Sequence, residues 1–178
     1  DSPVDDADSV WLHEYVHTRQ SFTASDSARW FVEGGANYYA ALLAYEQGNV
    51  SYESFRDALA RGQRDRYGDD VLAFPGTWSA GGDYLKGALA TGAVDLALRR
   101  ETNRTASFQG VFRDLNAHDG TVTNTVLLDA VEDAGGANVR QYAGGLTQSE
   151  RTADTWDAAT HERYFATMPA LFDVSIRS

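Results

Sequence analysis

Residues 13–17 read His-Glu-Tyr-Val-His, and this stretch decides how the rest of the chain is interpreted. Histidines four residues apart share one face of an α-helix, so His13 and His17 can present two ring nitrogens to one metal ion. Glu14 is rotated by about 100° from His13, which suits it to act on a metal-bound water rather than as a ligand on that face. The stretch therefore predicts a helix that carries an incomplete metal site.

Residues 30–39, Trp-Phe-Val-Glu-Gly-Gly-Ala-Asn-Tyr-Tyr, contain a carboxylate that can complete this site. A catalytic zinc usually has three protein ligands and one open position, so a third ligand must come from elsewhere. Glu33 follows His17 by sixteen residues, which allows the first helix to end and a second helix to return beside it. An unpaired carboxylate among apolar neighbours is costly, and a zinc ion removes that cost. The Gly34–Gly35 pair would let this helix approach a neighbour closely.

Residues 84–87, Tyr-Leu-Lys-Gly, open a later helix after a glycine-rich loop. A phenol near a zinc site can donate a hydrogen bond to the oxyanion that forms when water adds to a carbonyl, and Tyr84 is a candidate for that role. Lys86 stands out because it is the only lysine in a chain with 14 arginines.

Helix signals dominate the chain, and no strand alternation is convincing, so we predict a mainly α fold. Gly68, Pro75, Gly76, Gly81 and Gly82 mark an irregular loop before the helix that contains Tyr84. The predicted helices run from Ser9 to Phe22, from a cap at Asp26 and Ser27 to Gln47 before Gly48, from Ser51 to Arg66, from Asp83 to Arg100, and over 107–116, 123–134 and 137–143.

Together, the three motifs resemble those of the gluzincin metallopeptidases over about residues 9–145. The glycyl aminopeptidase family is the most similar, and the alanyl aminopeptidase and leukotriene hydrolase family is more distant. Those families have HExxH, then Trp-x-x-Glu-Gly, then Tyr-x-Lys-Gly, in the order found here. The resemblance implies the helical lobe of a thermolysin-like peptidase, in which the HExxH helix packs on the helix of the glutamate ligand. We expect an acidic linker (1–8), a helical zinc-peptidase domain (9–146) and a polar C-terminal extension of uncertain structure (147–178).

The resemblance also implies roles for individual residues. His13, His17 and Glu33 would bind Zn²⁺, Glu14 would be the general base, and Tyr84 would stabilise the transition state. The implied reaction is hydrolysis of peptide bonds in a peptide or protein substrate by a metal-activated water. The chain would be an endopeptidase or an aminopeptidase.

The chain departs from the family pattern at several places. Gly35 stands where a bulky residue is usual, and Arg19 stands where many zincins have an apolar residue. The family's strand that holds the substrate backbone lies upstream of HExxH, and we expect sequence upstream of Asp1. Asn37, one turn after Glu33, is a candidate hydrogen-bond partner in the site or a helix-surface residue. The alternative function is a non-catalytic zinc-binding or assembly domain that retains the peptidase helical lobe.

Composition limits the remaining classes. The 178 residues include no Cys, which excludes disulfide scaffolds and cysteine nucleophiles. The net charge is −11, from 18 Asp and 8 Glu against 14 Arg and one Lys, so we expect a high-salt source and no nucleic-acid partner. No apolar run is long enough for a transmembrane segment. The acidic start favours an exported or cell-surface protein over a cytoplasmic one, and the oligomeric state is left open.

The remaining aromatic, histidine and acidic residues are interpreted as structural. His118 is expected in solvent, His161 has no evident partner, and Asp69 with Asp70 is expected on the surface. The aromatic residues near the predicted ligands are expected in the core; they are Trp11, Trp30, Phe31, Tyr38 and Tyr39.

Overall fold

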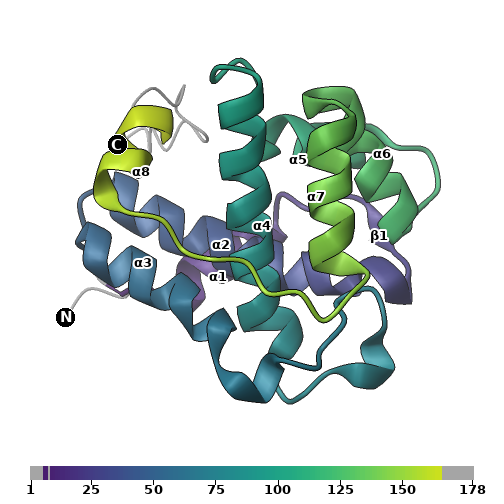
Figure 1. Ribbon diagram of the computed structural model, residues 1–178, viewed down its shortest axis with the longest axis horizontal. Helices are drawn as coiled ribbons and strands as arrows, with labels where there is room; N and C mark the ends of the chain where they lie inside the picture. The colour runs from purple at the N-terminus through teal and green to yellow at the C-terminus, as the bar shows by residue number, and fades with distance from the viewer. Residues whose placement is uncertain (1–5, 8, 166–178) are drawn as a thin grey trace.

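The computed structural model describes residues 6–7 and 9–165, which form a mainly helical fold (Figure 1). Most of the predicted acidic linker and residues 166–178 of the predicted extension lie outside the described residues. The α-helices are α1 (Val10–His17), α2 (Arg29–Glu46), α3 (Tyr52–Ala60), α4 (Gly82–Glu101), α5 (Phe108–Ala117), α6 (Asn124–Gly135), α7 (Ala137–Thr147) and α8 (Ala158–Phe165). Short elements are β1 (Thr23–Ala24), β2 (Thr121–Val122) and the 3-10 helices η1 (Asp26–Ala28), η2 (Arg61–Gln63), η3 (Asp65–Tyr67) and η4 (Pro75–Thr77).

Helices α2 and α4 form the centre of the fold, and the other helices pack around them (Figure 1). Helix α4 is buried continuously from Lys86 to Leu96, which explains why it shows no amphipathic stripe. A Cβ atom built on Gly34 of α2 would lie 2.5 Å from the carbonyl carbon of Gly87 on α4, so the two backbones are in direct contact. The close approach predicted for the Gly34–Gly35 pair is therefore confirmed at Gly34.

A buried ion pair holds the middle of α4 in place. Arg99 Nε donates to Asp95 Oδ1 at 3.0 Å, and both side chains are almost fully buried. Asp95 also accepts from the hydroxyl of Tyr38 at 2.7 Å and from the backbone N–H of Phe108 at 2.8 Å. These hydrogen bonds offset the cost of burying the carboxylate, and they join α2, α4 and α5 at one point.

Helix α1 ends at His17, five residues before the predicted end at Phe22. The chain then turns, and Asn116 binds it, because its side chain donates to the carbonyl of Arg19 and accepts from the N–H of Ser21. Strand β1 then pairs in parallel with β2, in the register Thr23↔Thr121. The prediction that this helix runs to Phe22 is wrong, because residues almost a hundred positions away supply these hydrogen bonds. The two short strands were not predicted, although the fold is mainly helical as expected.

Asp26 and Ser27 were predicted to cap the second helix, but α2 begins at Arg29 with no side-chain cap, and the Ser27 hydroxyl accepts from Asn124 N instead. Two other helix starts follow local signals. The hydroxyls of Ser9 and Ser51 accept hydrogen bonds from Leu12 N and Ser54 N, as N-caps do. Helix α3, however, ends at Ala60 rather than at Arg66. A Cβ on Gly62 would lie 2.5 Å from the carbonyl oxygen of Leu85, so contact with α4 shapes the chain there.

The described part of the predicted extension packs on α2 and α3. Trp156, His161 and Phe165 form a parallel stack, and Trp156 Nε1 donates to His161 Nδ1 at 3.2 Å. Tyr45 and Phe55 place their rings against His161, which is 3% exposed. His161 therefore has partners that the sequence analysis did not identify.

Four of the five aromatic residues that were expected in the core are buried. Trp11 was expected in the core, but it is 68% exposed because it lies on the outer face of α1. Trp30, Phe31, Tyr38 and Tyr39 are buried, and His118 is exposed, as predicted. Within the described residues, no helix combines the length and the apolar composition that a bilayer crossing requires.

Candidate metal centre

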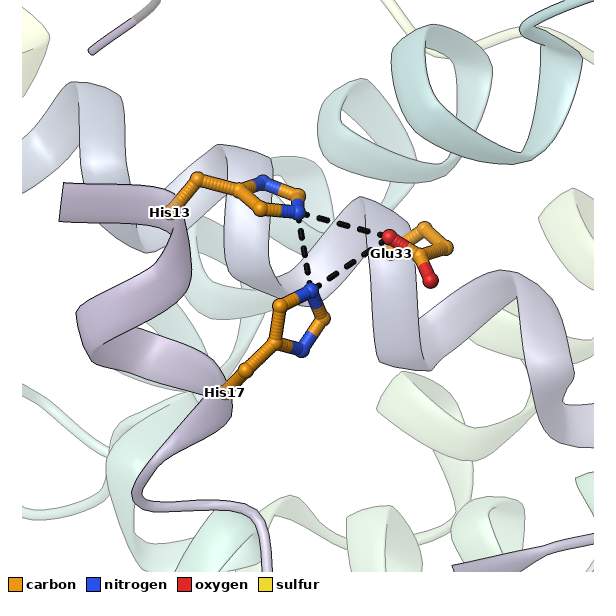
Figure 2. Close-up of side chains that lie close together, drawn as sticks. All are labelled: His13, His17 and Glu33. Atoms are coloured by element: carbon orange, nitrogen blue, oxygen red, sulfur yellow. Dashed lines mark hydrogen bonds and ion pairs between the residues drawn. The ribbon is translucent and has the colours of Figure 1, made fainter. Parts of the chain in front are cut away.

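His13 and His17 lie on successive turns of α1 and point towards Glu33 on the adjacent helix α2 (Figure 2). Their Nε2 atoms are 2.8 Å apart, and each Nε2 is 3.4 Å from Glu33 Oε2. Among the described residues, this is the only group of three His, Cys, Asp or Glu side chains whose ligand atoms converge closely enough for one metal ion.

Asn37 orients the ring of His13. Its Oδ1 lies 2.7 Å from His13 Nδ1, and its Nδ2 donates to the carbonyl of Tyr84 at 3.3 Å. Because the amide NH₂ faces a carbonyl, the amide oxygen faces the histidine and must accept from it. His13 therefore carries its proton on Nδ1, and its Nε2 has a free lone pair.

Gln20 orients His17 in the same way. Its Oε1 lies 2.6 Å from His17 Nδ1, while its Nε2 donates to the carbonyl of Val32 at 2.9 Å. His17 is thereby also held as the Nδ1–H tautomer. The sequence analysis missed Gln20, although its position three residues after His17 is a signal that could have indicated it.

Nε2 of His13, Nε2 of His17 and Oε2 of Glu33 consequently face one another, and with both rings as Nδ1–H tautomers each of the three atoms offers a lone pair. Such a cluster is unfavourable unless a cation lies between the lone pairs. Two imidazole nitrogens and one carboxylate oxygen form a common catalytic zinc ligand set.

The separations of these atoms fit zinc with little adjustment. Tetrahedral bonds of about 2.0–2.2 Å place two ligand atoms roughly 3.3–3.5 Å apart. The two nitrogen–oxygen distances of 3.4 Å meet this value, and the nitrogen–nitrogen distance of 2.8 Å is shorter. The two rings would need to part by about 0.5 Å, a small movement for side chains at the edge of the fold.

Tyr84 lies at the start of α4 with its ring stacked on that of His13, at a centroid distance of 5.9 Å and an interplanar angle of 17°. It is 38% exposed, so its hydroxyl can be reached from solvent. Burial raises the pKa of Tyr84, as do a hydrogen bond to Glu33 and the charges of Glu33, Asp83 and Glu14. The phenol is therefore held in its protonated form, which can donate a hydrogen bond.

Glu14 is exposed on α1, beside His13 and away from the two histidine rings on the helix surface. Its charge raises the pKa of Tyr84. His13, His17, Glu33, Asn37 and Tyr84 lie together, and Glu14 lies on the same helix as the two histidines. Arg19, the departure from the zincin pattern, donates to Tyr15 Oη and is exposed.

Comparisons of this chain with models of protein families, with curated proteins and with solved structures found no match.

Proposed function

We propose that this protein hydrolyses peptide bonds with a zinc ion held by His13, His17 and Glu33. The observation that carries the proposal is the convergence of two imidazole nitrogens and one carboxylate oxygen, with the ring of Tyr84 stacked on His13. The order and spacing of the three sequence motifs support the same reaction class. The proposed substrate is a peptide or protein, and the source is a high-salt one.

When bound, zinc supplies a water of pKa near 7 and polarises the scissile carbonyl. Glu14 accepts a proton from the attacking water and passes it to the leaving amine. Tyr84 donates a hydrogen bond to the oxyanion that develops on the carbonyl oxygen. Asn37 serves both sides of the site, because it orients His13 and binds the backbone of Tyr84.

The proposal is tested by the metal content and the peptidase activity of the purified chain in high salt. We expect about one zinc per chain in the native protein and almost none in the Glu33→Ala variant. Glu53→Ala is the matched control, because Glu53 is an exposed glutamate on α3, and this variant should retain zinc. The native protein should hydrolyse a mixture of peptides, and removal of zinc by a chelator should abolish that activity.

Two outcomes would contradict the proposal. A folded native chain that binds no zinc would remove the metal centre itself. A chain that binds zinc through Glu33 but hydrolyses no peptide would instead favour the non-catalytic zinc-binding or assembly function.

A further inference from the structure

Lys86 is the only lysine in the chain and is 2% exposed. Its Nζ donates to the backbone carbonyls of Asp70 at 2.5 Å and of Tyr67 and Glu150 at 3.0 Å each, and Gly68 O lies at 3.5 Å. The three ammonium protons thus find carbonyl acceptors from two separate segments. A compact ammonium can serve oxygens arranged around a point, whereas the planar fork of arginine cannot, which explains one lysine among many arginines.

Among these carbonyls, those of residues 67–70 belong to one end of the loop that leads into α4. The other end is tied to the first by Asp70, because Oδ1 of Asp70 accepts from Ser79 N at 2.9 Å. The hydroxyl of Ser79 donates to the carbonyl of Arg66 at 2.8 Å. Asp70 is 1% exposed, so the prediction that it lies on the surface is wrong. Lys86 therefore fixes a closed loop against the first turns of α4.

The opposite side of the same turns faces the candidate metal centre. Tyr84 and Lys86 are two residues apart, so they point about 200° away from each other around the helix. On the Tyr84 side, α4 meets α2 at Gly87, and Asn37 donates to the carbonyl of Tyr84. The start of α4 is consequently held between the metal ligands on one side and the carbonyls around Lys86 on the other.

We propose that Lys86 is a positioning residue for Tyr84. By binding the carbonyls of residues 67–70 and of Glu150, its ammonium fixes the first turn of α4, and with it the place of the Tyr84 hydroxyl beside the metal ligands. This inference rests on the proposed peptidase function. Lys86 touches neither ligand nor substrate in this role, and its whole effect passes through Tyr84.

A double-mutant cycle tests the proposal. Lys86→Met should lower kcat by about 10- to 100-fold, as expected for a displaced catalytic group, while KM and zinc content stay close to the native values. Lys86→Met should add no further loss to Tyr84→Phe, because both changes remove the same hydrogen bond. Arg113→Met, which removes an exposed positive charge on α5, is the control and should leave kcat unchanged. The proposal would be overturned if Lys86→Met lowered kcat by the same factor in the native protein and in the Tyr84→Phe variant.

A second measurement does not depend on activity. The ring of Tyr84 stacks on His13, so its NMR signals should be displaced by the imidazole ring current, and Tyr84→Phe identifies them. We expect these signals in zinc-free Lys86→Met to move towards those of a solvated tyrosine. Lys86→Arg, which keeps the positive charge, should fold and show a partial shift if Lys86→Met cannot be purified. An unchanged Tyr84 signal in either variant would overturn the proposal, even if the native chain hydrolyses no peptide.

Discussion

Gly34 of α2 and Gly87 of α4 touch through their backbones, with no side chain between them. This contact sets the distance between the helix that carries Glu33 and the helix that carries Tyr84. The contact is also close when viewed from α4, because a Cβ atom built on Gly87 would lie 3.1 Å from Gly34 Cα. The proposed metal ligand Glu33 and the proposed oxyanion donor Tyr84 are thus placed by two residues that have no side chains.

Gly34→Ala should separate α2 from α4. The added methyl group meets backbone atoms that cannot rotate away, so we expect the free energy of unfolding to fall by about 3 kcal/mol in thermal or denaturant titrations. Gly110→Ala on α5 is the control, because a Cβ there meets nothing within 4 Å. This control should leave stability unchanged or raise it by up to about 1 kcal/mol. Equal stabilities of the two variants would contradict the backbone contact.

Glu14→Gln should retain zinc and lose hydrolysis. The amide keeps the size of the side chain but cannot accept the proton of the attacking water, so we expect kcat to fall by about 10²- to 10⁴-fold. Glu162→Gln, on the exposed surface of α8, should be as active as the native protein. Appreciable turnover by Glu14→Gln with bound zinc would exclude Glu14 as the general base.

Tyr84→Phe should also retain zinc, because Tyr84 is not one of the three converging ligands. Loss of the hydroxyl removes one hydrogen bond to the oxyanion, and we expect kcat to fall by about 10- to 1,000-fold with little change in KM. Tyr164→Phe on α8 serves as the comparison. A native kcat in Tyr84→Phe would leave Tyr84 with a packing role only.

Gln20→Ala and Asn37→Ala should each weaken zinc binding. Each change removes the amide that fixes the tautomer and the orientation of one histidine, which typically costs about 10- to 100-fold in metal affinity. Competition with a chromogenic chelator measures the dissociation constant, and Gln141→Ala on the exposed face of α7 is the control. Native affinity in both variants would show that neither amide holds a ligand in place.

His161 should make the fold sensitive to acid. Burial lowers its pKa from 6.5 to about 4, and the charge of Arg99 acts in the same direction. Below pH 6.5 the unfolded chain binds a proton that the folded chain refuses, so stability falls as the pH drops from 6.5 to about 4, by about 3 kcal/mol in total. Denaturant titrations at several pH values should show that the free energy of unfolding of His161→Phe falls less steeply over this window than that of the native protein. In His118→Gln, which changes an exposed histidine, the free energy of unfolding should depend on pH as it does in the native protein.

Local sequence signals predicted most of the helices, and for three of them the hydrogen bond at the start is local. Ser9, Ser51 and Thr123 each cap a helix by accepting from an N–H three residues ahead. The clustering of His13, His17 and Glu33 was also predictable, because helical spacing and one reversal of the chain suffice to bring them together.

The features that the sequence analysis missed depend on distant residues. The end of α1 depends on Asn116 and on strand β2, and neither shows a signal near residue 17. The position of Gln20 after His17 is a local signal, but the orientation of its amide depends on the carbonyl of Val32 on α2. Asp70 resembled a surface acid next to Asp69, but its carboxylate closes the loop that Lys86 binds.

The three candidate ligands lie close together along the chain, whereas Tyr84, the proposed catalytic tyrosine, lies far from them in sequence. His13, His17 and Glu33 meet when one short segment reverses, and the entropic cost of closing so short a loop is small. Tyr84 lies beyond α3 and the loop bound by Lys86, so its place depends on the long-range packing of α2 against α4. A change in that packing should therefore displace the Tyr84 hydroxyl more than it displaces the three candidate ligands from one another.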